Sequence, residues 1–445
     1  MARATRFIAG PKTRPPADPL GDFFNRTSRP LSGYTCLHSD VPLLTSIQAL
    51  GAVNSQFRAL CGPWLWKTVH FPTSLPIPID LWTEGILPRE GLNVRSLSIK
   101  LASGIVLTPN DREPNAIDFD NIALDCNNFN RGRISPWNAT KLLIQCPNLH
   151  ELKVELDIET FTFDDHGVCA MGGMSQFNTF IVGISPLLSK MTALRHITWD
   201  GGAMGSTTES CLITMLKSLP WLESVSCKRL TRARKQQDEK QSLGFHLAQL
   251  KFLKKLSLYS VTSVDESWCL HSWPNHITHL EICWCREVSL KLAHQLIDRL
   301  APNLTSLTLG IHEKDGHNEK LKPDDSAHSI QEPFVLPTLT ALALRDESIH
   351  LLPLFRDCNR LNRLDCNISG EKHWALFQRV IDDLPWPQLQ YLKLIRNIDR
   401  RSTIIIDEQD WKRMWELCLR KGIRLILHND IGSIVRCIPT LGENL

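Results

Sequence analysis

The stretch Ile277–Leu309 reads ITHLEICWCREVSLKLAHQLIDRLAPNLTSLTL and decides the fold. Near its start, Leu280 and Ile282 share one face of a short strand, because side chains alternate along an extended chain. From Val288 onward, apolar residues recur at every fourth position, which is the spacing of one helix face. The strand pattern returns at Leu304, 27 residues after the stretch begins. One strand, one helix and one turn therefore form a repeating unit of the kind that stacks into a solenoid.

The same strand pattern recurs along most of the chain. Its apolar triplets predict eleven strand centres, at Val94/Leu97/Ile99, Leu149/Leu152/Val154, Leu194/Ile197/Trp199, Leu222/Val225/Cys227, Leu253/Leu256/Leu258, Ile277/Leu280/Ile282, Leu304/Leu307/Leu309, Leu339/Leu342/Leu344, Leu361/Leu364/Cys366, Leu389/Leu392/Leu394 and Gly422/Leu425/Leu427. A turn precedes most of them, often with a proline that stops the previous helix. The longer gaps predict insertions at 102–134, 161–177 and 312–332.

One such unit is too small to fold alone. It buries three or four apolar side chains at about 1.5–3 kcal/mol each, whereas ordering roughly 25 residues costs on the order of 1–2 kcal/mol apiece in backbone entropy. Stacking on neighbouring units closes that gap. We therefore predict an α/β leucine-rich-repeat solenoid over 76–430, with a parallel sheet on the concave side and helices on the convex side. Residues 431–445 then form either a C-terminal cap or a tail.

The chain before the repeats has a different composition. Residues 1–30 are rich in Pro, Arg and Gly, which predicts a disordered tail. From Val41, apolar residues step by three and four, which predicts an amphipathic helix through Leu60. Pro63 suits the first turn of a further helix. The apolar residues around it are expected to plug the open end of the repeat core: Trp64, Leu65, Val69 and Phe71.

Residues 31–75 resemble an F-box, a small all-helical module. Its second half carries the match, through Asn54, Phe57, Arg58, Leu60, Cys61, Pro63, Leu65 and Trp66. Its first half normally opens with leucine, proline and an acidic residue. Here Pro30-Leu31, Val41-Pro42 and Leu43-Leu44 are the nearest candidates, and the acidic residue is absent where it is expected. An ordinary helical cap on the repeat array is the alternative interpretation.

The repeat unit also resembles the cysteine-containing class of leucine-rich repeat that occurs in F-box proteins. In that class a cysteine follows the strand by three residues, as Cys285 does here, and a Cys-Pro turn precedes the next strand, as at Cys146-Pro147. The match is irregular, because other units lack the cysteine.

Together these resemblances imply the substrate-recognition subunit of a cullin–RING (SCF-type) ubiquitin ligase. In that family the box binds the S-phase kinase-associated adaptor, which joins it to the cullin scaffold, and the repeats hold a target for ubiquitin-dependent degradation. The adaptor-binding residues carried over are Leu43, Leu44, Ile47, Leu50, Phe57, Pro63, Leu65 and Trp66. The alternative is a non-catalytic interaction scaffold whose degenerate box does not bind the adaptor. A solenoid enzyme or enzyme regulator has no positive support.

Composition sets the remaining bounds. The net charge is +3 in 445 residues, which gives no global field for nucleic acid or an anionic membrane. The 14 cysteines are scattered, and several occupy buried repeat positions, which favours reduced thiols. We see no secretory signal and no apolar run long enough to span a bilayer. The expected location is the cytoplasm, the nucleus or both.

Motifs that carry chemistry are missing or weak. Gly201-Gly202-Ala203-Met204-Gly205 lacks the lysine of a phosphate-binding loop. Cys283-Trp284-Cys285 has no second pair at zinc spacing, although alternation would place both sulfurs on one side of an extended segment. Asp164-Asp165-His166 lies in a polar insertion. We expect no catalytic residues, cofactor or metal.

A cluster of basic residues follows one predicted strand: Lys228, Arg229, Arg232, Arg234, Lys235 and Lys240. It is either a solvated loop between repeats or a docking patch for an acidic partner or nucleic acid. It has no interleaved aromatic residues, which argues against single-stranded nucleic acid.

The predicted concave face offers a more specific candidate. Residues that flank the buried positions of each strand face away from the core. Along the last strands they turn basic and aromatic, and the predicted target-binding residues are Arg345, Arg363, Asp365, Tyr391 and Lys393. Arg and Tyr are enriched where interfaces concentrate their energy. Ordinary exposed strand residues are the alternative.

Overall fold

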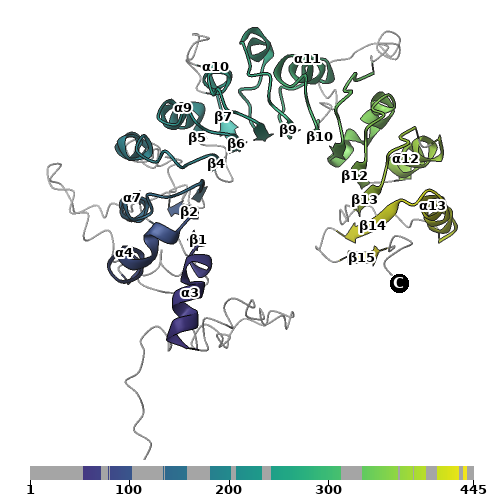
Figure 1. Ribbon diagram of the computed structural model, residues 1–445. Helices are drawn as coiled ribbons and strands as arrows, with labels where there is room; N and C mark the ends of the chain where they lie inside the picture. Colours follow the sequence, from purple (N-terminus) through teal and green to yellow (C-terminus); the bar gives the residue numbers. More distant parts are fainter. Residues whose placement is uncertain are drawn as a thin grey trace, which may run out of the picture.

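A single sheet of thirteen strands dominates the computed structural model. The structure describes residues 54–71, 79, 81–102, 134, 136–157, 181–201, 207–232, 242–311, 333–368, 371–383, 385–396, 408–429 and 434–437. Twelve strands are parallel and follow each other in chain order, so each pairs with the strands of adjacent units. Figure 1 shows these strands on the inner side of an arc and the helices on its outer side. This arrangement confirms the predicted α/β leucine-rich-repeat solenoid.

The strands of this sheet are, in order, β1 (Thr68–Phe71), β2 (Ser96–Ala102), β3 (Glu151–Asp157), β4 (His196–Asp200), β6 (Ser224–Lys228), β8 (Lys255–Tyr259), β9 (His279–Cys283), β10 (Ser306–Gly310), β11 (Ala341–Leu344), β12 (Arg363–Ile368), β13 (Tyr391–Arg396), β14 (Arg424–Asn429) and β15 (Ile434–Cys437). Two short strands, β5 (Thr207–Thr208) and β7 (Leu230–Thr231), form a second parallel pair.

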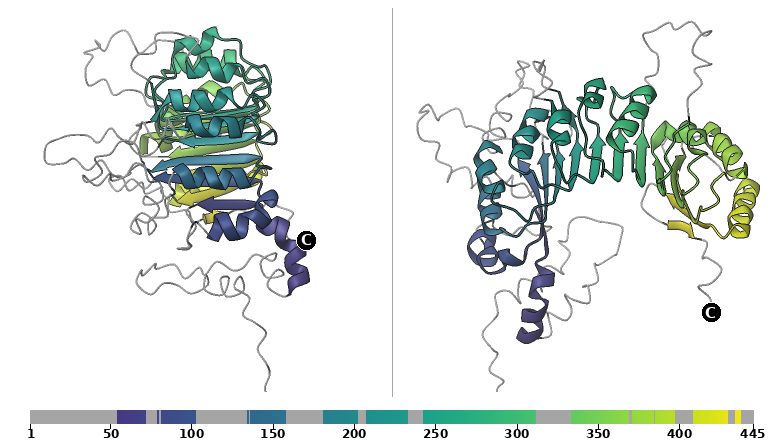
Figure 2. Two further views of the ribbon diagram at one scale, coloured as in Figure 1. Left: turned by 90° about the vertical axis from the view of Figure 1, so that its left-hand side faces the viewer. Right: turned by 45° about the horizontal axis from the view of Figure 1, so that its top comes forward.

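The helical elements are α3 (Ser55–Leu65), the π-helix η1 (Leu81–Ile86), α4 (Leu87–Glu90), the 3-10 helix η2 (Gly91–Asn93), α7 (Pro136–Gln145), α9 (Glu209–Lys217), α10 (Leu243–Ala248), the 3-10 helix η4 (Glu266–Leu270), α11 (Leu290–Leu300), the 3-10 helix η5 (Asp346–Phe355), α12 (Glu371–Asp383) and α13 (Glu408–Arg420). Residues 181–188 are also α-helical. The second view in Figure 2 shows the helices stacked side by side outside the sheet.

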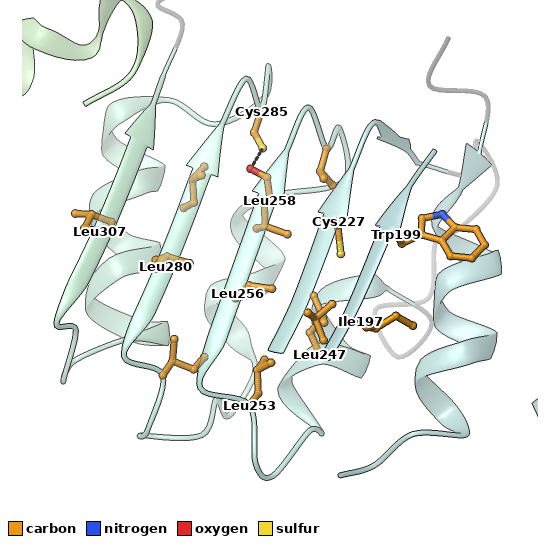
Figure 3. Close-up of a cluster of buried hydrophobic side chains, with 14 of the residues drawn as sticks. Ile197, Trp199, Cys227, Leu247, Leu253, Leu256, Leu258, Leu280, Cys285 and Leu307 are labelled. Atoms are coloured by element: carbon orange, nitrogen blue, oxygen red, sulfur yellow. Dashed lines mark hydrogen bonds between the residues drawn. The ribbon is translucent and has the colours of Figure 1, made fainter. Parts of the chain in front are cut away.

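Two columns of apolar side chains attach the sheet to these helices. One runs through Leu256, Leu280 and Leu307, which are partners in register on β8, β9 and β10 and are buried (Figure 3). The second column begins two residues later on each strand, as Leu258 and Ile282 show. All eleven predicted strand centres lie in this sheet. The three-and-five spacing therefore predicted the register as well as the strands.

A backbone feature repeats at the start of the strands. The carbonyl oxygen of Arg95 accepts the N–H groups of His150 (2.7 Å) and Glu151 (2.9 Å), and the same bond pair recurs from unit to unit. The residues just before the strands consequently form a ladder along one edge of the sheet. We call this ladder the amino-terminal rim: Lys67, Arg95, His150, Arg195, Glu223, Lys254, Thr278, Thr305, Thr340, Asn362 and Gln390.

The convex side is less regular than predicted. In two units, η4 and η5 replace the expected α-helix. Pro353 lies inside η5 and cannot donate a backbone hydrogen bond, which disfavours an α-helix there. The strand spacing fixes the concave side, whereas the convex side accepts any segment that delivers apolar side chains inward.

The residue after three neighbouring strands adopts a left-handed conformation. The φ angles of Arg229, Ser260 and Trp284 are 54°, 55° and 57°, and each N–H donates to a carbonyl of the next unit. The extended run therefore ends at Trp284, so strand alternation does not carry through to Cys285. The Cys285 thiol instead lies against the backbone oxygens of Leu258 (3.6 Å; Figure 3) and Cys283 (3.5 Å).

The C-terminal end of the sheet closes differently from its start. Gly422 follows α13 with φ 68°, and Ile423 N–H donates to the Cys418 oxygen, which is a glycine-dependent helix stop. The chain then enters β14, and β15 adds to β14 in the antiparallel sense. The predicted tail at 1–30, most of the insertion at 102–134, and all of the insertions at 161–177 and 312–332 lie outside the described residues.

Candidate interaction surfaces

The last strands bring several predicted target-binding residues together on the concave face. Arg363 on β12 is in register with Tyr391 on β13, and Asp365 is in register with Lys393. Arg345 follows β11 directly, and its N–H donates to the Leu309 oxygen at 2.7 Å. Residues from three adjacent strands thus make one surface, which we call the C-terminal face: Arg345, Arg363, Asp365, Tyr391 and Lys393.

A bidentate ion pair orients the central cation of this face. Arg363 donates from Nε to Asp365 Oδ1 at 3.1 Å and from Nη2 to Oδ2 at 2.9 Å. Its guanidinium carbon lies 4.8 Å from the centre of the Tyr391 ring. The bonds to Asp365 are the main reason that the pKa of Arg363 is raised. The guanidinium is therefore held in one direction, which leaves Nη1 as the donor for a partner.

The other members of the C-terminal face have distinct positions. Asp365 is buried, so it supports Arg363 and is not itself a contact surface. Arg345 Nη1 donates weakly to Asn367 Oδ1 at 3.5 Å. A Cβ added to Gly310 would lie 3.2 Å from the Arg345 Cβ, so glycine leaves room for this arginine. Lys393 is half-buried, and no salt bridge is found for it in the described part of the chain.

Sequence reasoning missed one residue beside this face. Arg424 begins β14 and is in register with Tyr391, so a further cationic side chain continues the row. The signal was present in the last predicted triplet, because a strand centred on Leu425 places residue 424 on the concave side.

A second candidate surface lies at the other end of the arc, on α3 (Figure 2). The Asn54 side chain accepts the Phe57 N–H at 2.9 Å and caps this helix. The helix runs through Pro63, so the prediction that Pro63 starts a helix was wrong. A strong cap sets the start at Ser55, and a proline late in the helix removes only one internal bond.

The outer side of α3 is apolar and exposed. Phe57, Leu60 and Trp64 are 41%, 71% and 64% exposed, and their spacing of three and four places them on one helix face. We call these three residues the α3 face. The prediction that Trp64 plugs the repeat core was therefore wrong, whereas Val69 and Phe71 are buried as expected.

The predicted adaptor-binding residues differ in how exposed they are in the structure. Phe57 and Pro63 are exposed, while Leu65 and Trp66 are half-buried. Trp66 packs edge-on against Trp82, with ring centroids 6.0 Å apart, and Trp82 in turn packs against Phe71 at 5.0 Å. Leu43, Leu44, Ile47 and Leu50 lie outside the described residues. The predicted adaptor-binding residues did not include Leu60 and Trp64, although helical spacing from Phe57 marks both.

Part of the basic cluster after β6 is occupied within the protein. Arg229 pairs with the buried Asp200 at 2.6 Å, and Arg232 pairs with Asp265. Both cations thereby tie neighbouring units together, which favours the structural interpretation for these two. Arg234, Lys235 and Lys240 lie outside the described residues.

Searches of the described residues for other kinds of site gave negative results. No group of three or more His, Cys, Asp or Glu side chains is placed to hold a metal ion. None of the helices in that part of the chain is both long and apolar enough to cross a membrane.

Comparisons with known proteins leave the family open. No protein-family model and no curated protein matches the chain. Among solved structures, it is similar to a crystallised protein from Bacteroides fragilis, a target of the Northeast Structural Genomics Consortium. The identity is 14% and the TM-score 0.32, over 64% of this chain and 66% of the other, just under two thirds of its length. At this TM-score the similarity assigns neither a family nor a function to this chain.

Proposed function

We propose that this chain is the substrate-recognition subunit of a cullin–RING ubiquitin ligase of the SCF type. In this proposal α3 docks the S-phase kinase-associated adaptor, and the repeats hold a protein target for ubiquitin-dependent degradation in the cytoplasm, the nucleus or both. The observation that carries it is the exposed α3 face immediately before a solenoid whose concave side presents an oriented arginine.

The α3 face supports the adaptor-binding part of the proposal. Three large apolar side chains at helical spacing are exposed to water, which is unfavourable. A partner that fully buries them would gain about 1.5–3 kcal/mol for each side chain. Apolar anchors at this spacing are typical of helices that bind in a groove of another protein. Trp66 and Leu65 then serve mainly to fix α3 on the repeat core.

The C-terminal face supports the target-binding part. Its arginine is already oriented by Asp365 and Tyr391, so a target would not have to order that side chain on binding. Such a receptor would do no bond chemistry itself. It would raise the local concentration of target lysines near a conjugating enzyme that the ligase supplies.

The adaptor test uses residues that the fold does not need. We expect the full-length chain to capture the adaptor and Leu60→Glu/Trp64→Glu to lose it with an unchanged melting temperature. Trp66→Asp is a poor probe, because it would also break the packing against Trp82. The matched control is Phe252→Glu/Leu270→Glu, since both side chains are exposed and belong to the middle units, away from α3.

Failure of the wild-type chain to capture the adaptor would contradict the ligase proposal. The second candidate would then be a non-catalytic scaffold that binds targets through its concave side alone. Affinity purification with the proteasome inhibited distinguishes the two, because only a ligase subunit would co-purify adaptor and cullin with the target.

A further inference from the structure

The amino-terminal rim changes character along the solenoid. Its members just before β9, β10 and β11 are Thr278, Thr305 and Thr340, and each hydroxyl donates to the carbonyl one unit earlier, at 3.4, 3.0 and 3.0 Å. In the middle, Glu223 and Lys254 form an ion pair at 2.8 Å. These parts of the rim are internally satisfied.

The first four rim positions are all basic: Lys67, Arg95, His150 and Arg195. They are successive rungs of one backbone ladder, since Arg95 N–H donates to the Lys67 oxygen, His150 to Arg95, and Arg195 to His150. Neighbouring strands lie about 4.8 Å apart, so the four positions span about 14 Å. Like charges opposite each other on neighbouring strands destabilise a sheet, so the fold alone gives no reason for this series.

Two of these side chains close a turn within the fold, and the other two do not. Arg95 Nη1 donates to the Leu92 oxygen (2.8 Å) and Arg195 Nη1 to the Thr192 oxygen (2.6 Å), so both also close the preceding turn. Lys67 and His150 are exposed. Lys67 lies 5.7 Å from the centre of the Trp64 ring, and neither it nor His150 has an acidic partner within ion-pair distance among the described residues.

We infer that these four residues form a binding site for a short acidic peptide segment of a protein partner. In an extended peptide, side chains on one side recur about every 6.7 Å, so three carboxylates at alternate positions span about 13 Å. That length matches the four-rung span. The site does not depend on the proposed ligase function.

The boundaries of the site favour a peptide over a longer polyanion. Glu223 occupies the fifth rung and lies 3.6 Å from Arg195, and Glu151 lies beside His150 in sequence. A nucleic acid strand carries a phosphate at every residue and would meet these carboxylates as it left the site. A peptide with only a few acidic residues avoids them.

The test uses the purified full-length chain and a fluorescein-labelled nine-residue peptide. The peptide carries glutamate at three alternate central positions with serine between and glycine outside. We expect anisotropy to show binding that weakens with salt, and at least about tenfold weaker binding when glutamine replaces the glutamates. We expect a comparable loss for Lys67→Glu/His150→Glu, and less than about twofold for the control Lys421→Glu/His276→Glu, whose side chains are also exposed.

Several results would overturn the proposal. One is equal binding of the glutamate and glutamine peptides by the wild-type chain. Another is unchanged binding by the rim double variant, with Lys67→Ala/His150→Ala as the substitute if charge reversal disturbs folding. A third is tighter binding of a ten-nucleotide oligothymidylate that the same variant abolishes, which would assign the site to nucleic acid instead. A melting temperature equal to or above that of wild type confirms that the rim variant is folded.

Discussion

Arg363 and Asp365 are two residues apart on β12 and are joined side by side by two hydrogen bonds, of 3.1 and 2.9 Å. Asp365 is buried, while half of the Arg363 side chain is exposed. A buried carboxylate thus orients a cation toward the concave side, where Tyr391 supports its other face. The pair separates two effects that a single arginine would combine, namely charge and direction.

Replacing Asp365 by alanine tests which effect a target uses. The change adds positive charge to the C-terminal face but releases the guanidinium of Arg363. If direction matters, target capture falls several-fold although the face becomes more basic. We also expect a loss of about 1–3 kcal/mol in the free energy of unfolding, because a bonded carboxylate is lost from a buried position. Increased capture by Asp365→Ala would show that charge alone is recognised.

Charge reversal on the C-terminal face should spare Arg363. Arg363→Glu would leave the buried Asp365 beside a second carboxylate, so lost capture could come from lost stability. Arg345→Glu/Lys393→Gln avoids this, since Arg345 bonds to Asn367 and the neutral replacement at position 393, which is in register with Asp365, adds no carboxylate there. We expect this variant to lose target capture while its melting temperature and adaptor capture stay unchanged. Capture at the wild-type level would remove the C-terminal face as the recognition surface.

Glu209 makes stability depend on pH. It begins α9 and is buried, and one of its carboxylate oxygens has no hydrogen-bond partner among the described residues. Burial raises the pKa of Glu209, and the nearby cation Arg232 only partly offsets this. Because the folded state holds the proton more tightly than the unfolded chain, this contribution to stability is complete below the ordinary glutamate pKa and is lost as the pH rises through the raised value.

Glu209→Gln removes this titration while keeping the shape of the side chain. We expect the variant to be more stable than wild type at neutral pH, and the difference to shrink as the pH falls toward about 4.5. Urea unfolding at a series of pH values measures it. Glu266→Gln, at an exposed position on η4, is the control. A difference that does not vary with pH would contradict the assignment.

The cysteines should react in an order set by burial. Burial raises the pKa of Cys146, Cys285 and Cys418 to about 12 each, so their thiolates are scarce in the folded protein. Cys269 is only partly buried, and its pKa is raised less. With iodoacetamide at about pH 8, peptide mass mapping should find Cys269 modified first among the described cysteines and the other three only after unfolding. Early modification of Cys285 would mean that the β9 end of the unit opens readily.

The rim peptide should bind more tightly at lower pH. Partial burial and the neighbouring cations Arg95, Arg195, His196 and Lys67 lower the pKa of His150. Bound carboxylates favour its protonated form, while the glutamates of the peptide stay ionised above about pH 5.5. The gain in affinity between about pH 7.5 and 5.5 should therefore be larger for wild type than for His150→Gln. Equal gains would show that the titrating group is not His150.

The sheet could be predicted from the sequence because its apolar pattern is periodic and because two separate constraints act on each buried position. Leu280 must be apolar to face the helices, and it must lie in register with Leu256 and Leu307 to stack. A one-residue slip would turn both columns outward. No such rule acts on the convex side, so η4 and η5 could not be anticipated in the same way.

The surfaces were predicted less completely, for a physical reason. Strand alternation correctly placed Arg363 and Tyr391 on adjacent concave positions, but it could not show that Asp365 is buried beneath the arginine. The exposure of Trp64 was also not predicted, because an apolar residue gives the same sequence pattern whether it is buried in the core or exposed on the surface. The basic rim was invisible in the sequence, since its four members are spread over 129 residues and only the backbone ladder aligns them.

The ladder also fixes the spacing between the two ends of the molecule. Each strand pairs only with the strand before and the strand after it in the main sheet. The distance from the basic residues before β1–β4 to the oriented arginine on β12 is therefore set by the number of units between them. Deleting one whole unit between them, such as 253–276, would shorten that path by about 4.8 Å along the sheet and leave both ends chemically intact. A single partner that binds both ends would then bind more weakly, because the distance between its two contacts would no longer match. Two separate partners that each bind one end would bind as before.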